Sequence, residues 1–251
     1  MPRDTHEARY LERKESHTRQ TDAEREEIAQ HNDYKAFTDL GHYAKVPQGY
    51  QKICCQFVYD VKHDGCHKAR LVAGGHLTPP DKDQAYSEVV SLQAMRLAIL
   101  AGEFNHLNIM VSNIGNAYLE SYTNEKVVFT AGPEFKVLEC HTLLIFKTLY
   151  GLRSSGARFH EALANTLGKE GFVPTKADLD LWIYPAGSCY EYVCVYVDDL
   201  LVVMKEPSTF FKNLSKKHGY KLKGVGDPEY HLGGNLVEIQ TVLYSGEPKL
   251  I

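Results

Sequence analysis

The stretch CVYVDDLLVVM, residues 194–204, places two adjacent carboxylates between two apolar runs. Short apolar runs on either side of a polar break predict a β-hairpin with buried strands, and Asp198 and Asp199 would lie at its tip. Aspartate pairs are common in turns, because Asp tolerates unusual backbone angles and hydrogen-bonds to nearby backbone. Taken alone, the pair therefore favours an ordinary turn over a functional site.

The same two carboxylates also have a functional interpretation. Mg²⁺ prefers oxygen ligands, and carboxylates on a rigid hairpin can hold it against a substrate phosphate. In two-metal nucleotidyl transfer, one ion activates the attacking hydroxyl and the other holds the leaving group, with the ions about 3.5–4 Å apart. Two carboxylates are rarely sufficient for this chemistry, so a third is expected at the end of another strand.

The surrounding sequence predicts an alternation of helices and strands. One helix is expected after Ser91, which is placed to cap it, with Gly102 near its end. A second helix, 157–169, is expected to stop at Gly171, and a third to run from a Ser208 cap to Gly219. The expected strands are 53–61, 68–73, 107–111, 126–130, 181–184, 190–197 and 200–204, with Asp64-Gly65 as a hairpin turn. This order predicts an α+β fold in which helices back an antiparallel sheet.

The bulk composition disfavours several classes of protein. The net charge of the 251 residues is −4, so any nucleic-acid contact must be local. The six cysteines form no pair of CxxC motifs and no apolar signal sequence opens the chain, which argues against a zinc site or a disulfide framework. No apolar stretch approaches the roughly 20 residues of a membrane span. We therefore expect a cytoplasmic or nuclear protein with no membrane partner.

Residues 1–33 form a polar N-terminal arm, dense in charged residues, His and Gln. Because such a segment has little apolar surface to bury, we expect it to be disordered or to form a solvated helix.

Several motifs, in one order along the chain, resemble a known family. The segment YVDDLL (196–201) resembles the catalytic box of reverse transcriptases, and LYGLR (149–153) followed by KAD (176–178) is similar to the copia-type LTR retrotransposon branch. The segments KARLVAGG (68–75) and YSEVVS (86–91) extend the resemblance over about residues 34–235. It implies a right-hand polymerase with fingers and palm that uses Mg²⁺ or Mn²⁺, an RNA or DNA template-primer and deoxynucleotides.

The resemblance also assigns roles by position. Asp198 and Asp199 match the metal-binding carboxylates of the palm, and Tyr196 matches the residue beside the primer end. Lys68 and Arg70 match the fingers region that meets the incoming triphosphate, where cations offset phosphate charge. Outside this context, both cations would more often be solvated charges on a strand.

Two further residues receive nucleotide-binding roles from the resemblance. Tyr118, in GNAYL (115–119), matches the aromatic position that screens the sugar 2′-hydroxyl, so its ring would favour deoxynucleotides sterically. A core aromatic is the alternative interpretation. Arg153 would contact the template or the nucleotide from the motif that precedes the second helix.

The sequence departs from the family where the third metal carboxylate is expected, because this position holds Asn113. Asparagine is nearly isosteric with aspartate but neutral, and its carbonyl oxygen is its only ligand atom. We therefore expect weakened metal binding and impaired polymerisation, by analogy with the losses of about 10²–10³ that follow removal of one neutral transition-state donor. Gly156 and Leu179 also stand where the family often has Pro.

The expected organisation has three parts: the arm at 1–33, the reverse-transcriptase fingers and palm at 34–235, and a remnant at 236–251. On the family pattern, this remnant would be too short for a full thumb or an RNase H domain, so a truncated and degenerate copy is expected.

Two other interpretations stay open. A non-catalytic remnant could bind nucleic acid or a protein partner through a lysine cluster, although such clusters are more often solvated helix faces: Lys212, Lys216, Lys217, Lys221 and Lys223. An unrelated globular domain would require the other motifs to be accidental. Geometry separates it from a polymerase, because Asn113 should lie within about 4–7 Å of the Asp-Asp turn if both surround metals about 4 Å apart.

Overall fold

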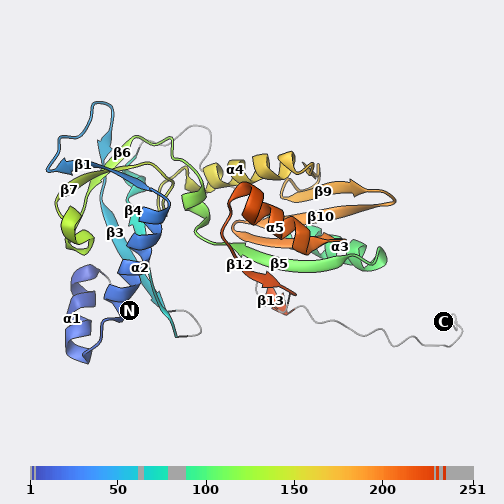
Figure 1. Cartoon of the computed structure of the whole chain (residues 1–251), viewed down its shortest axis with the longest axis horizontal. Coiled ribbons are helices and arrows are strands. Elements are labelled where there is room, and N and C mark those ends of the chain that lie inside the picture. The colour runs from blue at the N-terminus through green and yellow to red at the C-terminus, as the bar shows by residue number, and fades with distance from the viewer. Residues whose placement is uncertain are drawn as a thin grey trace, which may run out of the picture.

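The computed structural model describes residues 2, 4–61, 65–78, 89–228, 230–231 and 234–235. Its elements form an elongated molecule with two parts end to end, which we call the hairpin lobe and the sheet lobe (Figure 1). The N-terminal helices belong to the hairpin lobe, and three later helices, α3 (Leu92–Phe104), α4 (Ser155–Lys169) and α5 (Pro207–His218), belong to the sheet lobe. Among the described residues, no helix is long and apolar enough to cross a membrane.

The sheet lobe is built on six strands in the order β12-β5-β11-β10-β9-β8, all paired antiparallel. Their bounds are β5 (Asn108–Ile114), β8 (Val173–Pro174), β9 (Leu181–Ala186), β10 (Cys189–Tyr196), β11 (Asp199–Met204) and β12 (Leu222–Gly226). Because β5 lies between β11 and β12, a strand from the first half of the chain is central to a sheet made mostly from the second half.

Helices cover both faces of this sheet, which explains why β11 is apolar at every position after Asp199. Alternate side chains of a strand point to opposite faces, so Leu200 and Val202 join the core beneath α4 (Ser155–Lys169) and α5 (Pro207–His218). Leu201 and Val203 join the core beneath α3 (Leu92–Phe104). The sequence of a strand that is buried on both faces is a continuous apolar run, without the alternation of apolar and polar residues that a half-exposed strand has.

Helix α3 approaches the sheet at Gly102, which is buried. A Cβ atom at this position would lie 2.3 Å from Cγ1 of Val203, closer than any ordinary contact. Gly102 lies near the end of the helix, as predicted, and its missing side chain allows close packing of the helix against β11. Ser91 caps the helix as expected, since its Oγ accepts a hydrogen bond from the Ala94 amide at 3.2 Å.

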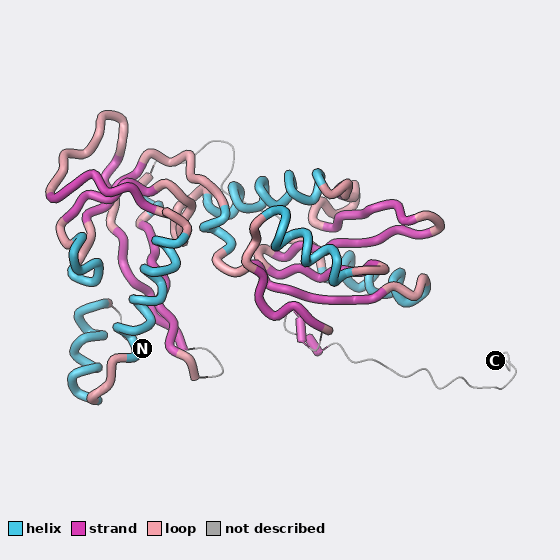
Figure 2. Tube along the Cα trace, in the orientation of Figure 1, coloured by secondary structure: helices cyan, strands magenta, loops and turns pink. Residues whose placement is uncertain are grey.

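The hairpin lobe contains a four-stranded sheet, order β1-β7-β6-β2, and a separate two-stranded hairpin, β3 with β4. Figure 2 shows these strands packed with two helices at the N-terminal end of the molecule. The bounds are β1 (Phe37–His42), β2 (Gln51–Lys52), β3 (Cys55–Val61), β4 (His67–Ala73), β6 (Val127–Thr130) and β7 (His141–Ile145). Short elements complete the fold: η1 (Gly75–Leu77), η2 (Ala117–Glu120), η3 (Pro133–Leu138), β13 (Tyr230–His231) and β14 (Gly234–Asn235).

The polar arm folds into two helices, α1 (Thr5–Glu15) and α2 (Arg19–Asp33). Glu24 of α2 is only 2% exposed and accepts hydrogen bonds from the Arg9 guanidinium and, at 2.5 Å, from the Tyr59 hydroxyl on β3. Burial, and secondly the hydrogen bond to Glu24, raises the pKa of Tyr59, so the phenol stays a neutral donor. The expected solvated face is therefore wrong for part of this arm, because its carboxylates find buried partners in the hairpin.

Helix α2 also covers the outer edge of β4. In its sheet this strand pairs with β3, and a bridge from Val72 to Tyr150 occupies part of its other edge; among the described residues, the rest of that edge has no strand partner. The Leu71 amide on that edge donates to Oε1 of buried Glu27 at 3.1 Å. A side-chain carboxylate thus takes the place of a neighbouring strand.

Most predicted helices and strands are present with shifted ends, but several elements differ, and strands β2, β8 and β12 lie outside the predicted strands. Helix α5 begins at Pro207 after Glu206, one residue before the predicted Ser208 cap, since Pro suits the first helical position. The antiparallel pair β1 and β7 was not predicted at all. Asp64 of the predicted hairpin turn lies outside the described residues, while Gly65 has the positive φ of 81° expected of such a turn.

We predict that Glu27→Ala destabilises the protein by about 1–3 kcal/mol, because it leaves the buried Leu71 amide without an acceptor. Urea unfolding followed by circular dichroism would measure the loss. Exposed Glu26 on the same helix provides the matched control, since Glu26→Ala should change stability by less than about 0.5 kcal/mol. Equal effects of the two substitutions would show that the edge contact contributes nothing.

Candidate active site

The Asp-Asp turn joins β10 to β11 at the edge of the sheet nearest the hairpin lobe (Figure 1). Tyr196 and Asp199 are paired across the hairpin, leaving Val197 and Asp198 as the turn residues. Val197 has a φ of 54°, a left-handed conformation that is unfavourable for a β-branched side chain. Backbone strain of this kind is found where the surrounding structure holds a turn in one conformation.

Asn113 faces this turn because of the strand register. It is the partner of Asp199 in the antiparallel pairing of β5 with β11, and the next amide, Ile114 N, donates to the Asp198 carbonyl at 2.7 Å. The Asn113 side-chain nitrogen donates to Oδ2 of Asp198 and to Oδ1 of Asp199, both at 2.9 Å. The predicted proximity of the three residues is therefore confirmed.

The amide of Asn113 links the two carboxylates by hydrogen bonds to both. An amide nitrogen has two protons to donate, and here each is directed at a different anion. The three side chains are partly buried, where hydrogen bonds to charged groups are stronger than neutral ones. Among the described residues, no group of three or more His, Cys, Asp or Glu side chains is arranged to hold a metal ion.

Two tyrosines connect the turn to the hairpin lobe. The Tyr118 and Tyr150 rings meet edge to face with centroids 4.8 Å apart, and the Arg70 guanidinium lies 5.6 Å from the Tyr150 ring centre. Burial, and secondly the charge of Asp198, raises the pKa of Tyr118. Burial is also the main cause of the raised pKa of Tyr150, which Asp198 raises further and Arg70 opposes. Both tyrosines are thus close enough to Asp198 for its charge to affect their pKa, and Tyr150 also contacts Arg70.

Lys68 lies farther along β4, at a hollow of about 560 Å³ between the two lobes. The hollow is lined by α2, by β4, and by Asn116 and Lys223 of the sheet lobe. Lys223 is the partner of Asn113 in the register of β12 with β5. The predicted nucleotide-binding cations Lys68 and Arg70 therefore both lie on the side of the hairpin lobe that faces the sheet lobe.

Arg153 has a different environment from the one predicted. Its Nε donates to the Gly75 carbonyl and its Nη2 to the His76 carbonyl, each at 3.0 Å. Gly151 lies against the same segment, with a φ of 87° and a Cβ position only 2.1 Å from the Ala73 carbonyl oxygen. In this structure Arg153 holds the loop after β4 in place, so its nucleotide contact stays a prediction.

Tyr150 is the residue that sequence reasoning missed. It lies within the LYGLR motif, yet no role was predicted for it. Its carbonyl accepts from the Ala73 amide at 2.7 Å, which joins the motif to the end of β4, while its ring lies between Arg70 and Tyr118. The motif was visible in the sequence, but its contact with β4 depends on residues some 80 positions apart.

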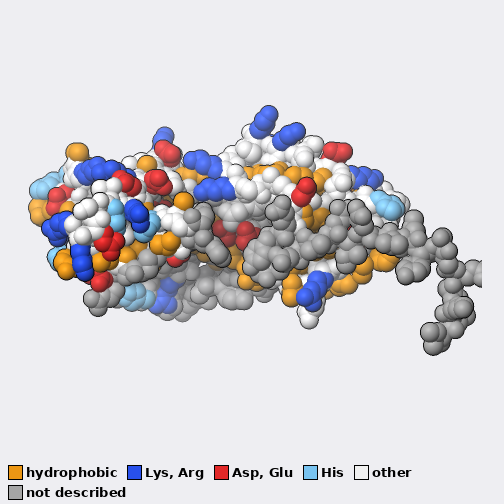
Figure 3. Space-filling model, turned by 90° about the horizontal axis from the view of Figure 1, so that it is seen from below, with side chains coloured by type: hydrophobic (Ala, Val, Ile, Leu, Met, Phe, Trp, Pro, Cys, Tyr) orange, Lys and Arg blue, Asp and Glu red, His pale blue; other side chains and the backbone are white. Residues whose placement is uncertain are grey.

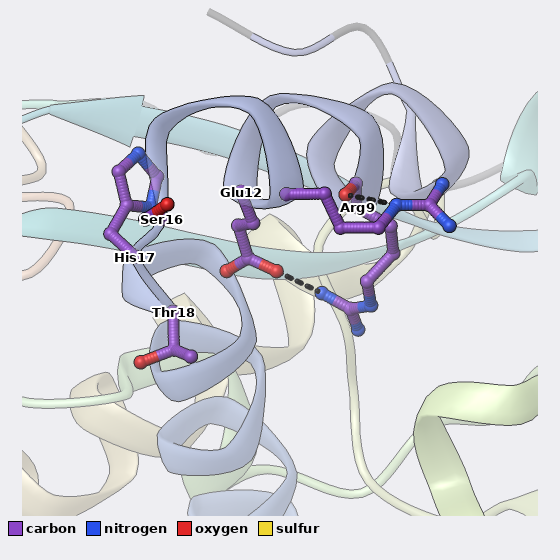
Figure 4. Close-up of a pocket in the computed structure, with 6 residues that line it drawn as sticks. Arg9, Glu12, Ser16, His17 and Thr18 are labelled. Carbon is purple, nitrogen blue, oxygen red and sulfur yellow. Dashed lines mark hydrogen bonds and ion pairs between the residues drawn. The ribbon is translucent and has the colours of Figure 1, made fainter.

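A second hollow, of about 440 Å³, lies on the arm (Figure 4). It is lined by Arg9, Glu12 and Arg13 of α1 and by the residues that lead into α2, including His17. In Figure 4 the Arg9 and Glu12 side chains point toward one another, and their ion pair measures 3.3 Å. None of the predicted site residues contributes to this hollow.

On the face shown in Figure 3, the visible Lys and Arg side chains are interspersed with Asp and Glu along both lobes. In the predicted lysine cluster, Lys212, Lys216 and Lys217 are exposed on α5, and Lys217 pairs with Glu170 at 2.7 Å. The α5 lysines are therefore solvated in this structure, as the less specific interpretation expects.

Asn113→Asp should lower the stability of the metal-free protein by about 1.5–3 kcal/mol, because a charge-assisted donor becomes a third anion. Like charges raise carboxylate pKa values, so this deficit should be present at pH 7 and shrink as the pH falls. Mg²⁺ should restore thermal stability to the variant more than to the unaltered chain. Differential scanning calorimetry measures both effects.

The exposed Asn213→Asp substitution adds the same charge elsewhere and serves as the control. If both variants respond equally to Mg²⁺ and pH, the Asn113 position has no special relation to the two carboxylates.

Comparison with known proteins agrees with the motif order. Residues 39–244 match the family model described as "Reverse transcriptase (RNA-dependent DNA polymerase)". The chain is 27% identical over 209 residues to the retrovirus-related Pol polyprotein from transposon RE1 of Arabidopsis thaliana, covering 78% of this chain and 14% of that relative. It is 24% identical over 197 residues to the transposon Ty1-LR2 Gag-Pol polyprotein of Saccharomyces cerevisiae, covering 76% and 11%. The chain therefore spans only a small part of the length of these relatives.

Proposed function

Since this chain belongs to the reverse transcriptase (RNA-dependent DNA polymerase) family, we propose that it is the polymerase domain of a copia-type retrotransposon with an impaired nucleotide-addition step. One observation carries the second half of this proposal: the neutral Asn113 amide is hydrogen-bonded to both Asp198 and Asp199. Its substrates would be deoxynucleotides and an RNA or DNA template-primer, handled inside the cell.

In this proposal the sheet lobe is the palm and the hairpin lobe is the fingers. The support is topological. Asn113 and Asp199 lie on adjacent central strands of the sheet lobe. From the hairpin lobe, Arg70 on β4 contacts the ring of Tyr150. A substrate bound between the lobes would meet carboxylates on one side and cations on the other. The arrangement suits a triphosphate, whose charge requires both a metal and basic side chains.

Reverse transcriptase domains generally use divalent metal ions, and this donor set fits such ions only in part. Asp198 and Asp199 supply the hard carboxylate oxygens that Mg²⁺ or Mn²⁺ prefers. Asn113 supplies at most one neutral oxygen, and its nitrogen competes for the carboxylates by donating to them. We therefore propose weak binding of divalent ions at these carboxylates, which when bound would activate the primer hydroxyl and stabilise the leaving pyrophosphate.

The remaining residues have roles that do not depend on the third carboxylate. Arg70 and Lys68 would attract the triphosphate, Tyr118 would pack against the sugar, and Tyr196, 38% exposed at the end of β10, would lie beside the primer. Arg153 would act through the backbone it holds after β4. Binding of substrates would thus be retained better than the chemical step.

A second candidate function follows from the same observation. With both carboxylates satisfied by Asn113, the turn is stable without a metal, which suits a domain that binds nucleic acid without copying it. Affinity for a primer-template duplex would then fall steeply with salt, because phosphate contacts release counterions.

Primer extension on an RNA template with Mg²⁺ tests the proposal. We expect trace synthesis by the unaltered chain and a gain of about 10²–10³ in Asn113→Asp, by analogy with the effect of one transition-state donor. Adding Asp198→Asn to that variant should abolish the gain, which controls for contaminating polymerases. Robust synthesis by the unaltered chain would contradict the proposed impairment. Duplex binding without gain in Asn113→Asp would favour the second candidate.

Tyr118 should set the choice of sugar in the active variant. In the Asn113→Asp background, Tyr118→Val should raise the efficiency of ribonucleotide use relative to deoxynucleotide use by about 10–200-fold, the range for a change of steric fit in a pocket. Tyr118→Phe keeps the ring and should leave the ratio unchanged. An unchanged ratio in Tyr118→Val would indicate that the ring serves only to pack against Tyr150.

A further inference from the structure

Helix α3 carries an apolar stripe on the face turned away from the sheet. Leu97, Leu100 and Phe104 follow one another at spacings of three and four residues, which places them on one side of a helix. Their exposed fractions are 64%, 51% and 76%. The buried side chains of the same helix, including Met95 and Ala98, point to the sheet. The helix is therefore apolar on two opposite faces, and only one of them is covered by described residues.

A helix that is apolar on both faces is expected when both faces are buried. In Figure 3, hydrophobic side chains gather along the lower edge of the half of the molecule that contains the large sheet. Three adjacent large apolar side chains on one helix are unlike the scattered exposed apolar residues of ordinary surfaces.

The stripe is complementary to itself when two α3 helices lie antiparallel. In that arrangement a twofold axis near Leu100 places this residue against its own copy. Leu97 of one helix then meets Phe104 of the other, to within a residue of the same register. The spacing matches the a and d positions of a heptad, where apolar side chains interlock between helices.

The charged residues beside the stripe are also complementary in this antiparallel arrangement. Arg96 and Glu103 are both exposed, and they lie seven residues apart on one flank of the stripe. In an antiparallel pair the same flank of each helix meets its copy, so Arg96 of one chain faces Glu103 of the other. Among the described residues neither makes an ion pair. The twofold axis repeats the contact, which gives each dimer two such pairs.

The other flank permits close approach. It holds the half-buried Ala101, whose small side chain leaves room for a second helix at the usual interaxial distance of about 8–10 Å. The apolar stripe, the pairing of Arg96 with Glu103 and the small side chain on the other flank therefore all favour a second copy of this chain, with its α3 antiparallel.

We propose that the exposed face of α3 is a homodimer interface, in which two copies of this chain pair α3 antiparallel about Leu100. The interface is confined to one helix of 13 residues, so the dimer is weak, as expected for interfaces below about 1,200 Å². The inference concerns assembly alone and does not depend on polymerase activity.

Sedimentation velocity of the full chain between about 1 and 200 μM provides the test. The unaltered chain should shift from monomer to dimer across this range. Leu100→Asp, which places two like charges at the axis, should remain monomeric throughout. Val137→Asp removes an apolar side chain that is 90% exposed on η3 and should dimerise like the unaltered chain. Circular dichroism verifies that each variant is folded.

The charge register gives a sharper test. Arg96→Glu should weaken the dimer by about tenfold, because two attractions become two repulsions. Adding Glu103→Arg to it should restore the original affinity. A strictly monomeric unaltered chain, association into larger species without a dimer, or a failure of the double variant to restore affinity would each overturn the proposal.

Discussion

The hydrogen bonds from one amide to two carboxylates are the interaction on which the candidate site depends. Two aspartates at neighbouring positions repel one another in a partly buried turn unless a cation or a donor lies between them. Asn113 is that donor, at 2.9 Å from each. Because it sits directly opposite Asp199 in the strand register, a one-residue shift of β5 against β11 would break the arrangement and turn the side chains of β5 to the opposite faces of the sheet.

The position of the hairpin lobe against the sheet lobe depends on a second set of contacts, which centre on Tyr150. Tyr150 joins the end of β4 by its backbone and meets Arg70 and Tyr118 by its ring. Gly151 allows this approach, since a Cβ there would collide with the Ala73 carbonyl. The hairpin lobe in turn depends on the arm, whose buried carboxylates Glu24 and Glu27 bond to β3 and β4. Three parts of the chain therefore position Arg70 and Tyr150: the N-terminal arm, the β3-β4 hairpin and the segment around Gly151.

Local patterns predicted the helices and the central strands of the sheet lobe, but not its outer strands β8 and β12. The helices after Ser91 and before Gly171 have apolar residues at helical spacing, and the strands around residues 190–204 are apolar runs bounded by turns. The hairpin lobe was harder to predict. Strands β1 and β7 were missed because each is short and contains several polar residues. Glu24 and Glu27 read as solvated charges, since nothing in the arm shows that donors on β3 and β4 will meet them.

The sequence by itself determined the family, the Asp-Asp turn, and the substitution of Asn113 for an expected carboxylate. These are local features, carried by residue identity and short-range order. Only the tertiary structure decided what Asn113 does, because its two hydrogen bonds require strands that are more than 80 residues apart in the chain to pair in one register. The tertiary structure also assigned Arg153 to the backbone after β4 and left one apolar face of α3 uncovered among the described residues. The physical reason is that these contacts join residues far apart in the chain, and a local sequence pattern does not specify which distant residues will meet.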